Sequence, residues 1–122
     1  LGLGLSAPPE QVELKEIVVA LAEALDLWCL LVHPVQEAGA VIGGSYEYTQ
    51  GPFTSRPRLT TGAGDNFNAG FCLGIMLELS LKESLILGKA ASGFYVRNMY
   101  SPSWKQIVGF LRLWAGRVGQ DF

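Results

Sequence analysis

Apolar residues recur at three- and four-residue steps over residues 10–27 of the chain. This spacing places them on one face of an amphipathic helix. Pro8 and Pro9 suit its first turn, because the backbone N–H groups there have no acceptor within the helix and proline has no N–H to leave unpaired. A continuous apolar run over residues 28–32 follows, and Pro34 ends it. Such a run predicts a strand that is buried on both faces.

Two further short strands are predicted at residues 40–42 and 46–49, and Gly43 and Gly44 between them favour the turn of a β-hairpin. The order of elements is therefore one helix, short strands and then three helices. A buried strand needs a neighbour on each side, so this order predicts part of an α/β domain whose remaining strands would precede residue 1. The unpaired sheet edge of such a part predicts association between copies.

The second half of the chain has a helical pattern. Residues 65–79 are apolar or small at nearly every position, which predicts a helix buried on most faces. Ser80 begins the next helix, which runs to about residue 97, because Glu83 lies three positions on and completes a capping box. The pair Ser101-Pro102 predicts a third helix, with serine as the N-cap and proline in the first position.

Composition narrows the class of protein. The 122 residues suit one domain, and a net charge of −2 without a Lys/Arg-rich stripe argues against a nucleic-acid partner. Cys29 and Cys72 lie in apolar runs, as small buried side chains do, and neither has a second ligand at metal spacing. The longest apolar stretch, residues 69–77, is too short for a membrane span. Without a secretory signal, we expect a cytoplasmic protein with reduced thiols and no membrane partner.

Most of the chemical signal lies in the segment LTTGAGDNFNAGF, residues 59–71. Gly62 and Gly64 come directly before a predicted helix, where an open backbone and free N–H groups favour an anion such as phosphate. A carboxylate at this point repels phosphate, so its presence in an anion site indicates a role in the reaction. Asp65 can take a proton from a hydroxyl group that attacks phosphorus, so the pattern predicts phosphoryl transfer.

Other interpretations of these glycines fit less well. A dinucleotide-binding fingerprint, as in an oxidoreductase, needs glycine where Phe67 stands. A Walker-type loop needs Gly-Lys-Ser/Thr, but Asp65 and Asn66 follow Gly64. A purely structural alternative is that the glycines shape a turn and Asp65 caps the helix.

The whole segment resembles the second signature of the ribokinase (PfkB) carbohydrate kinases, which has a threonine-rich lead, Gly-Ala-Gly-Asp and then a small-residue helix. The matching residues are Thr60, Thr61, Gly62, Ala63, Gly64, Asp65, Phe67, Ala69, Gly70 and Phe71. A weaker resemblance covers most of residues 10–115. It implies that residues 1–122 are the carboxyl-terminal portion of one ribokinase-like domain, a three-layer αβα sandwich, with the amino-terminal half absent.

The resemblance also implies a function and roles for individual residues. The complete protein would be an ATP-dependent phosphotransferase acting on a hydroxyl of a sugar or nucleoside-like substrate, with Mg²⁺ accompanying the nucleotide. Asp65 would be the general base, and the backbone of Gly62, Ala63 and Gly64 would form the anion hole. The residues bordering the nucleotide would be Thr61, Lys89 and Ser92. The alternative is a truncated, non-catalytic chain that binds nucleotide or serves a structural or assembly role.

The chain departs from the family pattern in several places. The Asn-x-x-Glu motif associated with Mg²⁺ and phosphate is absent, since no asparagine precedes Asn66. Leu59 and Tyr100-Ser101 replace residues that help form a monovalent-cation site in some members, so no such site is expected. His33-Pro34 stands in the usual Thr/Gly-rich turn, and Lys89 stands where an asparagine is often found.

Several other residues are weaker candidates. Arg56 and Arg58 could neutralise phosphate charge, although solvated loop arginines are at least as good an interpretation. His33 is most simply a loop residue at a strand end, and Asn66 or Asn68 could bond the loop backbone. The large residues assigned to the core, or for the tryptophans to core or interface, are Phe67, Phe71, Met76, Trp104 and Trp114.

Overall fold

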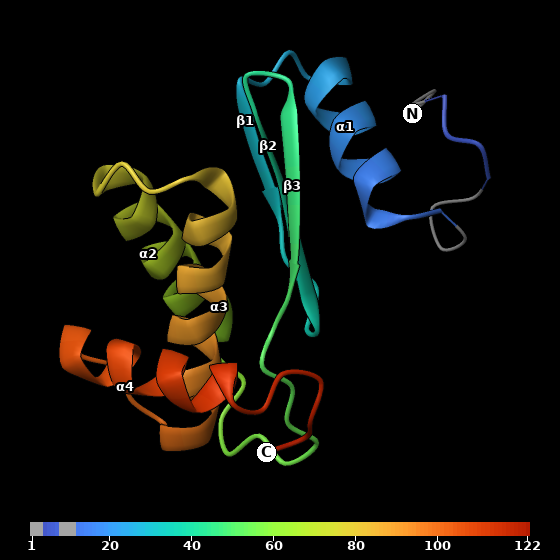
Figure 1. The fold of residues 1–122 in the computed structure, drawn as a ribbon. Coiled ribbons are helices and arrows are strands. Elements are labelled where there is room, and N and C mark those ends of the chain that lie inside the picture. Colours follow the sequence, from blue (N-terminus) through green and yellow to red (C-terminus); the bar gives the residue numbers. More distant parts are fainter. Residues whose placement is uncertain (1–3, 8–11) are drawn as a thin grey trace.

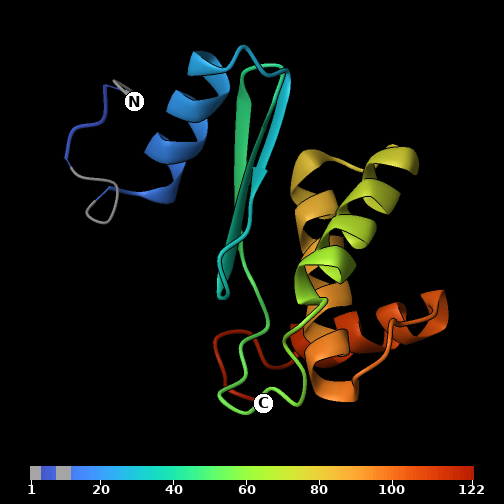
Figure 2. The same ribbon diagram turned by 180° about the vertical axis from the view of Figure 1, so that it is seen from behind.

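The computed structural model describes residues 4–7 and 12–122, so Pro8 and Pro9 lie outside the described residues. A three-stranded sheet stands between two layers of helices (Figure 1). Helix α1 covers one face, and α2 and α3 lie on the other with α4 against α3; Figure 2 shows the same layers from behind. The predicted mixed α/β order is confirmed, and the elements are α1 (Leu14–Ala24), β1 (Cys29–Val32), β2 (Glu37–Ile42), β3 (Ser45–Gln50), α2 (Ala63–Met76), α3 (Leu81–Asn98) and α4 (Trp104–Ala115).

The sheet is antiparallel with the order β1-β2-β3. Gly43 and Gly44 have φ values of 54° and 82°, which are suited to a tight hairpin turn, so the predicted hairpin is confirmed. Strand β2 begins earlier than predicted, at Glu37, which pairs with Gln50 and accepts a 2.9 Å hydrogen bond from the Tyr48 hydroxyl. These partners stabilise a strand start that the polar sequence did not indicate.

The prediction of a fully buried first strand is wrong for the described residues. Cys29 is exposed, the other three residues of β1 are only partly buried, and the preceding Trp28 is 71% exposed. Strand β1 pairs with β2 alone within residues 4–7 and 12–122, so its other edge meets no described strand. The apolar run indicates a strand suited to burial, but burial on all sides also needs a neighbour at that edge.

Strand β2 supplies both halves of the core. Ala38 and Ala40 point towards α2 and α3 and pack in a cluster with Phe67 and Phe71. Val41, on the opposite face, packs against α1. A third cluster joins α3 and α4, and its buried residues are Leu87, Ala90, Ala91, Phe94, Ile107, Phe110 and Trp114. The alternating sides of one strand thus hold the layers together.

Helices α2 and α3 approach each other closely through small residues. A Cβ at Gly74 would lie 2.7 Å from the Ser84 Cα, so any larger residue would force the helices apart. The remaining faces of α2 are more open than predicted. Met76, assigned to the core, is 79% exposed, and Cys72 is exposed like Cys29.

Serine residues fix the starts of the last two helices. The predicted capping box of Ser80 and Glu83 is confirmed at α3. The predicted start of α4 is wrong, because the N-cap is Ser103 and not Ser101. Ser103 forms a reciprocal capping box with Gln106 and so satisfies two backbone donors that Ser101 would leave without partners. Of the two tryptophans on α4, Trp114 is buried and Trp104 is 55% exposed.

Candidate functional site

The Gly-Ala-Gly-Asp segment forms the amino-terminal start of α2. Gly62 is the N-cap and has a φ of 89°, a left-handed conformation that favours glycine. The Tyr95 hydroxyl from α3 donates a 2.8 Å hydrogen bond to the Thr61 carbonyl oxygen. A Cβ at Gly62 would lie only 2.8 Å from this hydroxyl oxygen. Both the backbone conformation and the close contact therefore require glycine at this position.

Two of the three amides predicted for the anion hole, those of Gly62 and Gly64, donate to no backbone carbonyl within the described residues. The Ala63 N–H donates to the Thr60 carbonyl, and the Asn66 N–H and side-chain amide both donate to the Gly62 carbonyl. The expectation that Asn66 bonds the loop backbone is confirmed. No acceptor for the N–H groups of Gly64 and Asp65 is found within the described part of the chain, and no side chain caps the helix. These two donors, with the helix dipole behind them, can receive an anion.

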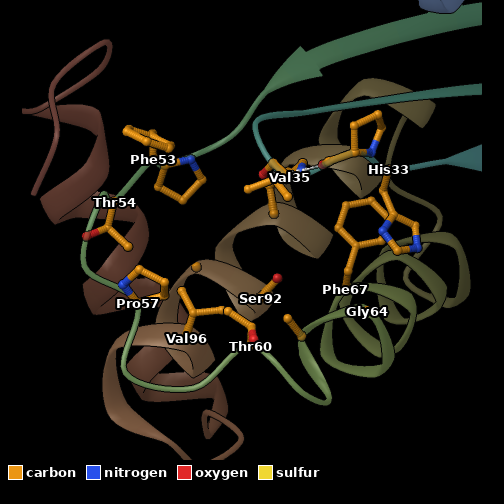
Figure 3. A pocket seen from close by; sticks show the side chains of 15 residues that line it. His33, Val35, Phe53, Thr54, Pro57, Thr60, Gly64, Phe67, Ser92 and Val96 are labelled. Atoms are coloured by element: carbon orange, nitrogen blue, oxygen red, sulfur yellow. Dashed lines mark hydrogen bonds between the residues drawn. The ribbon is translucent and has the colours of Figure 1, made fainter. Parts of the chain in front are cut away.

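A cavity of about 260 Å³ opens beside this helix start. Figure 3 shows His33 and Phe67 on one side of the cavity and Phe53, Thr54 and Pro57 on the other. Of the predicted site residues, Ala63, Gly64, Lys89 and Ser92 line the cavity, whereas Thr61, Gly62 and Asp65 do not. The lining is mostly apolar with a few polar groups, as is usual for a small-molecule site.

Asp65 faces a second hollow. This hollow measures about 280 Å³, and Asp65 lines it together with Asn66, Ser101 and Pro102. The Asp65 carboxylate is exposed and has no hydrogen-bond partner among the described residues. Gly64 lines the first cavity and its neighbour Asp65 lines the second, so the amino terminus of α2 separates the two.

Lys89 is buried in the wall of the first cavity with only 5% exposure. Its Nζ donates to the carbonyl oxygens of Pro34 at 2.7 Å and Val35 at 3.2 Å, and it lies 5.5 Å from the centre of the Phe67 ring. Burial lowers the pKa of Lys89 from 10.5 to about 8, and the negative charge of Glu37 opposes this shift.

His33 lines the first cavity and packs on the helix start, although the sequence indicated only a loop residue. Its ring stacks on Phe67 with centroids 4.4 Å apart, and its Cε1 lies 3.4 Å from where a Cβ at Gly64 would be. Burial, followed by the positive charge of Lys89, lowers the pKa of His33, so the surroundings disfavour the charged form of the ring. Its position at a strand end was visible in the sequence, but its stacking partner lies far along the chain.

The opposite wall of the cavity, formed by Pro52, Phe53, Thr54 and Pro57, is held by Arg97. The Arg97 guanidinium donates to the Phe53 carbonyl at 2.9 Å and, through Nε, to the Phe122 carbonyl at 3.0 Å. The Ser55 N–H adds a 2.8 Å bond to the Asp121 carboxylate. Nothing in the sequence indicated a role for Arg97 in the site, because no local pattern indicates partners more than 20 residues away. Arg56 and Arg58, considered as phosphate-neutralising candidates, are exposed and do not line this cavity.

No group of three or more His, Cys, Asp or Glu side chains in residues 4–7 and 12–122 could hold a metal ion. In the same part of the chain, no helix has both the length and the apolar character needed to cross a bilayer.

Solved structures place the fold in the ribokinase-like class. Ribokinase from Arabidopsis thaliana, solved with ribose and ATP, is similar over 82% of this chain and 35% of its own, with a TM-score of 0.72 and 23% identity. Phosphofructokinase-2 from Escherichia coli is similar over 91% of this chain and 35% of its own, with a TM-score of 0.70 and 19% identity. The predicted ribokinase-like fold is therefore confirmed.

Sequence comparison narrows the class to one family. The model of the prokaryotic ketohexokinase family matches residues 5–114, so the chain belongs to this family. A ketohexokinase from Haloferax volcanii is 40% identical over 78 residues, which cover 64% of this chain and 19% of that protein. The chain thus spans about a fifth of that relative's length, and the predicted kinship with PfkB-type carbohydrate kinases is confirmed.

Proposed function

We propose that the complete protein containing this chain is an ATP-dependent kinase that phosphorylates a hydroxyl group of a ketohexose, with Asp65 as the general base. The observation that carries this proposal is the start of α2, where the free amides of Gly64 and Asp65 lie between two hollows. One hollow suits a nucleotide, and the other contains the only carboxylate of the Gly-Ala-Gly-Asp segment. The family name supports a ketohexose as the substrate.

The first cavity is proposed to hold the adenosine part of ATP. Its apolar wall, with Phe67 and Val96, suits a planar base, and the Thr60 and Ser92 hydroxyls offer polar contacts. The Gly64 amide lies at its end, where the phosphates would meet the helix dipole. The ATP bound to the Arabidopsis ribokinase supports this choice of nucleotide. Thr61 does not line the cavity, so a direct role for it is not proposed.

The proposed reaction is a phosphoryl transfer in which Asp65 takes up the proton that the substrate hydroxyl group loses. The substrate hydroxyl oxygen attacks the γ-phosphorus and forms an O–P bond, and the P–O bond to ADP breaks. Asp65 accepts the hydroxyl proton, and the N–H groups of Gly64 and Asp65 stabilise the charge on the transferred group. Mg²⁺ would be bound mainly through the nucleotide phosphates, since the described residues contain no group of three or more His, Cys, Asp or Glu side chains that could hold a metal ion.

A non-catalytic role is the second candidate. The match to only 19% of the length of a ketohexokinase favours it for these residues in isolation. Under this alternative, the chain binds nucleotide or serves in assembly, but lacks the rest of a sugar site.

The test is a substrate screen with the complete protein. ADP release is measured with ATP and, separately, a ketohexose, an aldohexose, ribose and adenosine, and the phosphorylated product is identified by ³¹P NMR. We expect the highest kcat/KM for the ketohexose. Preference for another sugar would refute the substrate class, and nucleotide binding without any transfer would favour the non-catalytic alternative.

A further inference from the structure

Lys89 connects four segments around the first cavity. It lies on α3, and its Nζ donates to the carbonyl oxygens of Pro34 and Val35 in the turn between β1 and β2. Its aliphatic stem packs on Gly51, where a Cβ would lie 2.8 Å from the Lys89 Cδ. Its charge also lies over the ring of Phe67 from α2. A single side chain therefore links α3, α2, the end of β3 and the turn that carries His33.

The surroundings of Lys89 are unusual for a buried cation. An ammonium group removed from water normally requires a bonded carboxylate. No ion pair to Lys89 is formed within the described residues; the compensating groups are two backbone carbonyls, the aromatic face of Phe67 and the more distant charge of Glu37. Such bonds are charge-assisted and stronger than neutral ones, so they fix the turn firmly.

The turn held by Lys89 is itself a wall of the cavity. His33, Pro34 and Val35 all line it, and the His33 ring is stacked on Phe67. Two of the three Nζ donors of Lys89 bond carbonyls of this turn, so the side chain acts mainly on the protein and not on a ligand.

We propose that Lys89 is a positioning residue that holds the His33–Val35 turn against α3 and thereby sets the affinity of the first cavity for nucleotide. This inference rests on the proposed function, because it takes the cavity as the nucleotide site. It gives Lys89 an indirect role in place of the direct nucleotide contact predicted from the sequence.

The test compares Lys89→Met with Lys82→Met in the complete protein. Methionine keeps an unbranched stem but removes the charge and the donors. Lys82 lies on the same helix and also donates to a backbone carbonyl, that of Tyr48, but it is exposed and does not line the cavity. Steady-state kinetics give kcat and both KM values, and amide hydrogen exchange reports on residues 33–36.

We expect Lys89→Met to raise the KM for ATP about tenfold, equivalent to about 1.4 kcal/mol. The kcat and the KM for the sugar should stay within about twofold, because Lys89 does not line the hollow that contains Asp65. Exchange at residues 33–36 should become faster, whereas Lys82→Met should leave all these values unchanged. General destabilisation would instead lower kcat without changing the KM for ATP, and that pattern would overturn the inference.

Failure of the inference and failure of the proposed function give different results. If the wild-type protein uses ATP and Lys89→Met has the same KM for ATP, the positioning role alone is refuted. If the wild-type protein does not bind ATP, the proposed function is refuted and the inference with it.

Discussion

Replacing Gly62 by alanine should destabilise the loop that presents the free amides. Gly62 has a φ of 89°, and holding an alanine in this left-handed region costs roughly 1–2 kcal/mol. The new Cβ would also lie 2.8 Å from the Tyr95 hydroxyl oxygen, so this hydroxyl must move away from the Thr61 carbonyl. Loss of that hydrogen bond adds about 1 kcal/mol. The free energy of unfolding should therefore fall by about 2–3 kcal/mol.

Urea denaturation of the complete protein measures this change. The matched control is Gly109→Ala, in the middle of α4, where a Cβ would meet nothing within 4 Å and alanine should stabilise by roughly 0.5–1 kcal/mol. Tyr95→Phe separates the two contributions, because without the hydroxyl the cost of Gly62→Ala should fall by about 1 kcal/mol. An unchanged free energy of unfolding in Gly62→Ala would refute the reasoning.

Three further changes test other parts of the structure. Gly74→Ala should lower the free energy of unfolding by about 1–3 kcal/mol in urea denaturation, because its Cβ would overlap Ser84; no change would contradict the close packing of α2 and α3. Burial lowers the pKa of Lys89 from 10.5 to about 8, so the unfolded chain binds more protons than the folded protein between these pH values. The free energy of unfolding of the wild type should therefore rise with pH across this window, by up to on the order of 3 kcal/mol relative to Lys89→Met. A constant difference between the two proteins would contradict this burial. Arg97→Met should speed hydrogen exchange at residues 53–58 by about tenfold, since it frees the Phe53 carbonyl, and equal exchange rates would show that Arg97 does not hold this wall.

Local patterns predicted the elements of this fold but not all their boundaries. The hairpin at Gly43-Gly44 and the capping box at Ser80 were predictable, because each depends on residues a few positions apart. The start of α4 was not, because Ser101-Pro102 and Ser103 both fit an N-cap and only the bond to Gln106 decides between them.

Burial was predicted less well than secondary structure. The apolar character of Cys29, Cys72 and Met76 indicates surfaces suited to contact, but all three are exposed among the described residues. An amino-acid pattern shows which residues gain from burial, whereas their actual exposure depends on which elements lie against them.

The candidate site was predictable only as far as its motif. The sequence indicated Gly62, Gly64 and Asp65, and the structure places them at one helix start. The sequence could not indicate that His33 stacks on Phe67, or that Arg97 holds a wall of the cavity, because these contacts join distant segments. The assignment of Asp65 as the base stays a prediction.

The most direct test of that assignment compares Asp65→Asn with wild type in the complete protein, by kinetics and by calorimetric titration with ATP. Asp26→Asn, the same exchange at an exposed position far from α2 in the chain, is the control. If Asp65 is the general base, kcat falls by about 10²–10⁴-fold while ATP binds equally or more tightly, because a negative charge beside the phosphates is removed. A kcat within a few fold of wild type would contradict the account.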